Sequence, residues 1–244
     1  MKKLIGKDSE NHIRKFFKKN NWKPLEFQIE SWESYIKGES GIIQVPTGYG
    51  KTYAALMGPL LKLKELKCSK GINILLVTPL KALSRDLKKS ILNAIQFFDP
   101  NITAGIRNGD TSNYVKRKQI INPPNILITT PESLTLLIAN KESNKLFSNL
   151  FSIIIDEWHE LMGCKRGNQC ELALSWLRGN NQNIQIWGMS ATIGNIEEAA
   201  SSILGLSSKQ PKIIKSNLVK NIEIKSIIPN NIGTFPWSGH LGIK

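Results

Sequence analysis

The residues best suited to chemistry lie in two segments that are far apart in the sequence. The first is a glycine-rich turn that ends in Gly50, Lys51 and Thr52. In such a turn glycines let backbone N–H groups wrap a polyphosphate, the lysine neutralises its β and γ charges, and the threonine hydroxyl binds Mg²⁺. The second is the acidic pair Asp156 and Glu157, which follows an apolar run at 152–155. Because carboxylates can hold the metal ion and orient the attacking water, the two segments together predict hydrolysis of a nucleoside triphosphate.

We therefore expect Lys51, Asp156 and Glu157 to be the catalytic residues, with Thr52 and Asp156 as ligands of Mg²⁺. The phosphate loop has Val45 where the common pattern has its first glycine. The alternatives without a function are a chance Gly-Lys-Thr at a helix start and two exposed acids at a strand end. The presence of both motifs in one chain disfavours these alternatives. The nucleotide-binding residues expected in this loop are Thr47, Gly48, Tyr49, Gly50, Lys51 and Thr52. The ring of Tyr49 suits the loop if it points to solvent.

A glutamine upstream of the loop could recognise the base of the nucleotide. The amide of Gln28 can donate and accept at once, which matches the N7 and N6 edge of adenine. Phe17 or Trp22 could stack on the base, although each ring taken singly is more often a core residue. After the acidic pair, hydroxyls at the end of the next strand could hydrogen-bond the acidic motif and relay the state of the nucleotide. The expected coupling residues are His159, Ser190 and Thr192.

Hydroxyl-bearing turns at three other junctions between strand and helix could bind a phosphate backbone. Backbone N–H groups and hydroxyls at such junctions contact phosphates and read no base edges. Each turn could equally be a helix cap. The expected nucleic-acid contacts are Thr78, Pro79, Lys81, Asp110, Thr111, Thr130, Pro131 and Glu132. Isolated basic residues such as Arg85, Arg107 and Arg166 are expected to be solvated surface.

Alternating strands and helices must position these side chains. Apolar runs at 41–45, 74–78, 126–130, 151–155 and 184–188 predict strands covered on both faces, and helical periodicity follows at 51–66 and 80–98. The alternation predicts an α/β fold with a mostly parallel central sheet and helices on both faces. Ligands bind such sheets at the carboxyl ends of the strands, where the acidic pair falls. A further strand is expected at 222–228.

Composition limits the class of protein and its partners. The chain has 244 residues, 41% of them hydrophobic, which is ordinary for a globular protein. No apolar run approaches the roughly 18 residues of a membrane span, and the three cysteines form no C-x-x-C pair that would indicate zinc. We expect a cytoplasmic protein with no membrane partner. The net charge of +14 is compatible with a polyanionic partner, although a Lys-, Asn- and Ile-rich composition could also reflect an AT-rich genome.

Taken in order, these motifs resemble those of the first RecA-like domain of superfamily 2 helicases. Finer details are similar to the large helicase-related (Lhr) family, and Trp158 within the acidic box, followed by Glu160 and Leu161, resembles its ligase-associated DNA-damage-response branch. The resemblance implies a RecA-like phosphate-loop NTPase fold, with ATP and Mg²⁺ as cofactors. It also implies an ATP-dependent DNA helicase or translocase that acts in DNA repair and moves 3′ to 5′. The finer motifs are Lys165-Arg166-Gly167, Ser190-Ala191-Thr192-Ile193-Gly194-Asn195 and Pro236-Trp237-Ser238-Gly239-His240.

The resemblance also divides the chain into three segments. Residues 1–38 are a helical lead-in with the adenine-recognition motif, 39–220 are the first RecA-like ATP-binding domain, and 221–244 are a linker toward a second RecA-like domain. Because the motifs of that second domain are absent, we expect an N-terminal part of a helicase that is nearly inactive alone. Its expected partners are single-stranded or duplex DNA, with RNA possible, and the second domain. The alternatives are an RNA helicase or a nucleotide-dependent nucleic-acid-binding module that does not unwind.

Overall fold

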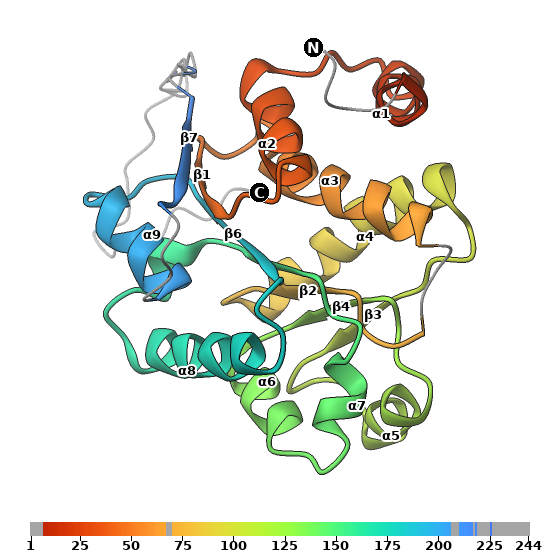
Figure 1. The fold of residues 1–244 in the computed structure, drawn as a ribbon, viewed down its shortest axis with the longest axis vertical. Coiled ribbons are helices and arrows are strands. Elements are labelled where there is room, and N and C mark those ends of the chain that lie inside the picture. The colour runs from red at the N-terminus through yellow and green to blue at the C-terminus, as the bar shows by residue number, and fades with distance from the viewer. Residues whose placement is uncertain (1–6, 67–69, 206–209, 217, 219–224, 226–244) are drawn as a thin grey trace, which may run out of the picture.

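The computed structural model describes residues 7–66, 70–205, 210–216, 218 and 225 (Figure 1). These residues form a seven-stranded sheet in the order β3-β4-β2-β5-β6-β1-β7, and each neighbouring pair of strands is parallel. This confirms the predicted α/β fold with a parallel central sheet. The strands are β1 (Gly41–Gln44), β2 (Ile74–Val77), β3 (Ala104–Arg107), β4 (Ile126–Thr129), β5 (Ser152–Ile155), β6 (Gln185–Ser190) and β7 (Lys212–Lys215).

Helices connect the strands and cover the sheet on both of its faces, as Figure 1 shows. The helices are α1 (Lys7–Lys19), α2 (Glu26–Ile36), α3 (Lys51–Glu65), α4 (Lys81–Phe98), α5 (Asn113–Ile121), α6 (Pro131–Ile138), α7 (Ser143–Phe147), α8 (Lys165–Asn180) and α9 (Ile196–Leu204). A short 3₁₀ helix, η1 (Trp158–Glu160), follows β5. No helix among the described residues is long and apolar enough to cross a membrane.

Two hydrophobic cores lie on opposite faces of the sheet because successive side chains of a strand point to opposite sides. In β2, Ile74 and Leu76 join the core built with α1 to α4, whereas Leu75 and Val77 join the core built with α6 to α9. This double burial explains why the central strands are continuous apolar runs rather than alternating patterns. The predicted strands at 41–45, 74–78, 126–130, 151–155 and 184–188 are confirmed within two residues at each end.

The two edge strands, β3 and β7, are not predicted from the sequence. Their runs, Ala-Gly-Ile-Arg and Lys-Ile-Ile-Lys, are mixed in polarity and half-buried, because an edge strand has a neighbour on one side only. The strand expected at 222–228 and the motif at 236–240 lie outside the described residues, apart from Lys225. The proposed segment boundaries at 38 and 220 stay predictions.

The parallel sheet brings the ends of non-consecutive strands to one edge. β5 lies between β2 and β6, and β1 lies beside β6. The backbone N–H of Asp156 donates to the carbonyl of Val77 at 2.8 Å, and that of Val45 donates to the carbonyl of Ser190 at 3.0 Å. The phosphate loop after β1 and the acidic pair after β5 therefore lie on either side of the end of β6.

We predict that Gly41→Ala destabilises the chain, because a methyl group at Gly41 would overlap the carbonyl oxygen of Lys212 in β7. Overpacking of this kind costs about 1–3 kcal/mol, measured as a lower urea midpoint. The control is Gly179→Ala in α8, where nothing lies within 4 Å of the new methyl group. That variant should gain up to about 1 kcal/mol from helix propensity. Equal midpoints for the two variants would contradict the pairing of β1 with β7.

Candidate nucleotide site

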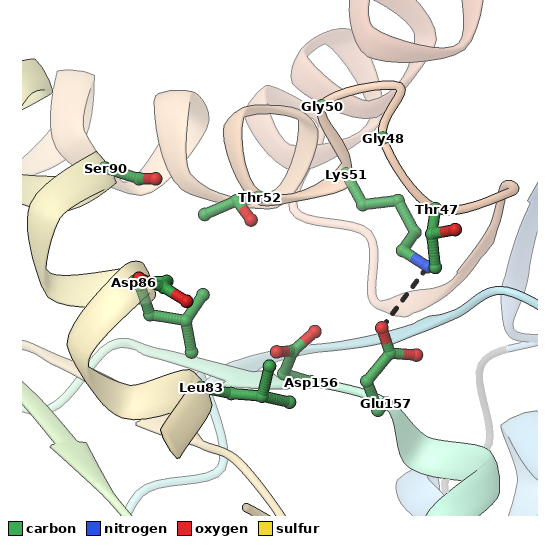
Figure 2. A pocket seen from close by; sticks show the side chains of 11 residues that line it. Thr47, Gly48, Gly50, Lys51, Thr52, Leu83, Asp86, Ser90, Asp156 and Glu157 are labelled. Carbon is green, nitrogen blue, oxygen red and sulfur yellow. Dashed lines mark ion pairs between the residues drawn. The ribbon is translucent and has the colours of Figure 1, made fainter. Parts of the chain in front are cut away.

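A cavity of about 260 Å³ opens at the carboxyl edge of the sheet, between the start of α3 and the first turns of α4 (Figure 2). The phosphate loop and the acidic pair both line it, which brings together the two segments that the sequence singled out. The lining residues are Thr47, Gly48, Gly50, Lys51, Thr52, Leu83, Asp86, Leu87, Ser90, Asp156 and Glu157.

The phosphate loop requires its glycines. Gly48 has φ 92° and Gly50 has φ 81°, a left-handed conformation that side chains with a Cβ rarely adopt. Helix α3 begins at Lys51, directly after Gly50, so its N-terminal N–H groups are available to an anion in the cavity. Tyr49 is partly buried and packs against the core of α1 to α4, so the loop accommodates its ring without full exposure to solvent.

Lys51 and Glu157 form an ion pair across the cavity, with 3.6 Å between Nζ and Oε1 (Figure 2). Their side chains are only 8% and 19% exposed. The ammonium group of Lys51 has no hydrogen-bond partner among the described residues, and neither has Oε2 of Glu157. Since a buried ammonium group without hydrogen bonds is costly, this site is suited to an anionic ligand that would supply them.

The two carboxylates occupy different environments. Asp156 is 8% exposed, and its burial together with the adjacent charge of Glu157 raises its pKa to about 6, against the opposing effect of Lys51. Glu157 has φ 45° and ψ 51°, which is unusual for a residue with a side chain. Backbone strain of this kind is concentrated at functional sites. Figure 2 shows both carboxylates on the cavity wall below Thr52.

These residues fit Mg²⁺ carried by a nucleotide better than a metal bound by protein alone. No group of three or more His, Cys, Asp or Glu side chains in the described part of the chain could hold a metal ion. Magnesium is typically held by one or two carboxylates together with substrate phosphates and water. The poorly solvated carboxylate of Asp156 and the hydroxyl of Thr52 supply that kind of oxygen donor.

A hydrogen-bonded chain links the acidic loop to the end of β6. The hydroxyl of Ser190 lies 2.9 Å from Nδ1 of His159 and donates to the carbonyl of Thr192 at 3.0 Å. The same Nδ1 lies 3.5 Å from Oε2 of Glu157. The predicted coupling residues therefore meet, with Thr192 contributing its backbone rather than its exposed side chain.

Gln28 lies against the phosphate loop. Its Oε1 accepts from the N–H of Leu25 at 3.0 Å, and its Nε2 donates to the carbonyl of Gly50 at 3.1 Å. Both ends of the buried amide are thus engaged by the protein in this structure. Of the two rings considered for stacking, Phe17 is buried in the core and Trp22 is 44% exposed.

The predicted nucleic-acid contacts fall into two groups. Four of them are buried in this structure, namely Thr78, Pro79, Thr130 and Pro131, and their contact with nucleic acid stays a prediction. The charged ones are accessible but paired: Nζ of Lys81 lies 2.7 Å from Oδ1 of Asp110, and Glu132 pairs with Arg166. The hydrogen bond from Lys81 lowers the pKa of Asp110. Thr111 is half-buried and its hydroxyl accepts from the N–H of Asn108.

The side of the cavity that α4 contributes is not predicted from the sequence. Leu83, Asp86, Leu87 and Ser90 line the cavity with the spacing of one helix face. That periodicity is visible in the sequence, but only the sheet topology shows which face of α4 meets the phosphate loop. Arg166 was also misjudged, since it is not simply solvated surface but hydrogen-bonds to Glu132 and Pro79.

Comparison with known proteins identifies relatives over most of the chain. The model of the DEAD/DEAH box helicase family matches residues 25–199. The ATP-dependent helicase Lhr-Core of Sulfolobus acidocaldarius is 35% identical over 207 residues, covering 79% of this chain and 23% of that protein. The Lhr helicase/probable uracil glycosylase of Mycolicibacterium smegmatis is 34% identical over 195 residues, covering 75% and 13%. The chain spans less than a quarter of these two relatives.

Solved structures show the same fold. The structure of Mycobacterium smegmatis helicase Lhr bound to ssDNA and AMP-PNP has a TM-score of 0.80 and 28% identity, over 90% of this chain and 28% of that one. The crystal structure of the DUF1998 helicase MrfA bound to DNA has a TM-score of 0.74 and 25% identity, over 89% and 30%. With the match to the family model, these likenesses confirm the RecA-like helicase fold.

We predict that Asp156→Asn stabilises the chain without nucleotide. Between pH 3.8 and about 6 the folded chain keeps a proton on Asp156 that the unfolded chain has released, so stability falls as pH rises through this window. At pH 7.5 the variant should gain about 1–3 kcal/mol in the free energy of unfolding, and the gain should vanish toward pH 4.

Urea titrations at several pH values measure this difference. The control is Asp86→Asn, because Asp86 lines the same cavity but its side chain is 77% exposed. That variant should stay within about 0.5 kcal/mol of the parent chain at every pH. A gain for Asp156→Asn that does not change with pH would show that the burial of its charge is not the cause.

Proposed function

We propose that this chain is the ATP-binding motor domain of a DNA helicase or translocase. The chain belongs to the DEAD/DEAH box helicase family and is a homologue of the Lhr helicases. We assign it to the ligase-associated branch, with a role in DNA repair in the cytoplasm. The observation that carries the proposal is the convergence of Lys51 and Glu157 on one cavity. The activity of the whole helicase is part of the proposal, since the chain spans only part of its relatives.

ATP is the nucleotide that we propose for the cavity. Backbone N–H groups of Gly48, Gly50 and the start of α3 would hold the phosphates, and Lys51 would turn from Glu157 to the β and γ oxygens. Gln28 would recognise adenine through its second amide N–H and the second lone pair of Oε1, while its contact to Gly50 would link base recognition to the loop. Trp22, the exposed ring, would stack on the base.

Hydrolysis in this proposal depends on Glu157. Once Lys51 engages phosphate, the carboxylate of Glu157 is free to orient water and accept its proton. Asp156 and Thr52 would hold Mg²⁺, which when bound would neutralise charge on the β and γ phosphates. His159 and Ser190 would couple the position of Glu157 to the end of β6. Nδ1 of His159 lies 3.5 Å from Oε2 of Glu157 and 2.9 Å from the hydroxyl of Ser190.

Nucleic acid would bind along the turns after β2, β3 and β4. Lys81 and backbone N–H groups of these turns would contact phosphates, so binding would be salt-dependent and largely independent of sequence. DNA is the proposed polymer because the solved Lhr and MrfA structures are described as bound to ssDNA and DNA. RNA is the alternative polymer. A comparison of the affinities for single-stranded DNA and single-stranded RNA would decide between the two.

A second RecA-like domain is the proposed partner in catalysis. Within the described part of the chain no arginine lines the cavity, whereas phosphoryl transfer in motor proteins commonly uses one, worth about 10³–10⁵ in turnover. The chain by itself would therefore act as a nucleotide-dependent binding module. Robust unwinding by residues 1–244 alone would contradict this assignment.

We predict that Lys51→Ala abolishes productive ATP binding, because it removes the buried cation that faces the phosphates. Loss of one partner of a buried charged contact costs about 2–5 kcal/mol, which is about 30-fold or more in affinity. Calorimetric titration with ATP and Mg²⁺ measures it. Lys89→Ala on α4 is the control, because its side chain is 82% exposed and it does not line the cavity. An unchanged affinity of Lys51→Ala for ATP would contradict the assignment of this segment as a phosphate-binding loop.

We predict that Glu157→Gln, placed in the complete helicase, leaves ATP binding intact and lowers turnover by about 10²–10⁴-fold, because the amide keeps the shape but cannot accept the proton. Steady-state hydrolysis with saturating single-stranded DNA is the measurement. Glu160→Gln is the matched control, since that neighbouring carboxylate contacts His159 but does not line the cavity. Near-normal turnover in Glu157→Gln would exclude its role as base.

A further inference from the structure

Arg166, in the first turn of α8, contacts two turns that belong to other elements. Its guanidinium donates from Nε and Nη2 to the carboxylate of Glu132, and from Nη2 to the carbonyl of Pro79. Pro79 lies in the turn between β2 and α4, and Glu132 lies in the first turn of α6, after β4. One side chain therefore joins the turns that follow two adjacent strands, β2 and β4.

The chemistry of these contacts is specific to arginine. Burial acts to raise the pKa of Glu132, but hydrogen bonds, above all from Arg166, outweigh it and lower that pKa below its ordinary value. Glu132 is therefore a stable anionic partner. A planar guanidinium can serve a carboxylate and a carbonyl at once through a rigid set of donors. A lysine ammonium on a flexible chain would keep the charge without this fixed geometry.

The backbone at the base of Arg166 is itself held in place. A Cβ on the next residue, Gly167, would overlap the carbonyl oxygen of Leu161, so only glycine allows this close approach. The N–H of Cys164 also donates to that carbonyl at 3.4 Å. Leu161 directly follows η1, which carries His159. The first turn of α8 thus packs against the segment that leads away from the acidic pair.

We propose that Arg166 is a positioning residue that fixes the spacing between the Pro79 turn and the start of α6, so that both contact one nucleic-acid strand. The inference rests on the proposed function, because these turns are the nucleic-acid contacts proposed above. It assigns Glu132 to the same task, as the anchor of Arg166 rather than as a ligand of nucleic acid.

The role of Glu132 separates positioning from simple electrostatics. If the charge of this face alone mattered, Glu132→Gln would strengthen binding of nucleic acid, because it removes a negative charge near the phosphates. If Arg166 positions the turns through Glu132, the same change weakens binding. If Arg166 contacted a phosphate directly, its substitution would also reduce the magnitude of the slope of log K against log[salt] by about one. Positioning leaves that slope unchanged.

Fluorescence anisotropy with a labelled single-stranded DNA oligonucleotide tests the proposal on the 244-residue chain. We expect Arg166→Gln and Glu132→Gln each to weaken binding about three- to tenfold, as for loss of a half-exposed charged hydrogen bond, without change of the salt slope. The double variant should bind no more weakly than either single variant, because each single substitution already breaks the same contact between Arg166 and Glu132. Arg166→Lys should recover only part of the affinity. Affinity for an ATP analogue should be unchanged in Arg166→Gln.

Lys165→Gln and Glu142→Gln are the matched controls, since both residues are exposed and each variant makes the same change of charge. Thermal melts identify folded variants, and if Arg166→Gln does not fold, Arg166→Lys and Glu132→Gln decide the question. Wild-type or tighter binding by Glu132→Gln would overturn the inference while leaving the proposed function intact. Failure of the parent chain to bind single-stranded DNA at low salt would overturn both.

Discussion

Lys51 and Glu157 hold opposite charges 3.6 Å apart in a cavity that also buries the carboxyl group of Asp156. Burial of the Asp156 carboxyl group, and after it the adjacent charge of Glu157, outweigh the effect of Lys51 and raise the pKa of Asp156 to about 6. The arrangement is costly without a ligand and suits one that brings both phosphate for the lysine and a cation for the acids. The other features of the site keep these three groups together.

The parallel sheet supplies that constraint. β5 lies between β2 and β6, and Glu157, whose backbone is left-handed, forms its ion pair with Lys51 of the phosphate loop from the end of β5. Contacts then extend outward from the same loop, through His159 to Ser190 on one side and through Leu161 to the first turn of α8 on the other. In the proposed function, nucleotide and nucleic acid would thus bind turns at one edge of the sheet.

The sequence predicts the parts of this account that depend on local chemistry. A glycine-rich turn, an acidic pair after an apolar run and strands without polar alternation are recognisable one segment at a time. It does not predict the edge strands β3 and β7, because half-burial leaves their pattern mixed. Nor does it predict the burial of Thr78 and Thr130, or the contacts of Arg166 with Glu132 and Pro79. The burial and the contacts depend on which turns the strand order brings together, and tertiary packing determines the strand order.

Mapping where a nucleotide binds tests the proposed site most directly. Backbone amide chemical shifts of the 244-residue chain, recorded before and after addition of Mg²⁺ and a non-hydrolysable ATP analogue, report this residue by residue. We expect the largest changes at Gly48, Gly50, Lys51 and Thr52, with further changes at Asp156 and Glu157 as Lys51 leaves its ion pair. Saturable changes confined to another surface, with this loop unaffected, would contradict the proposed site.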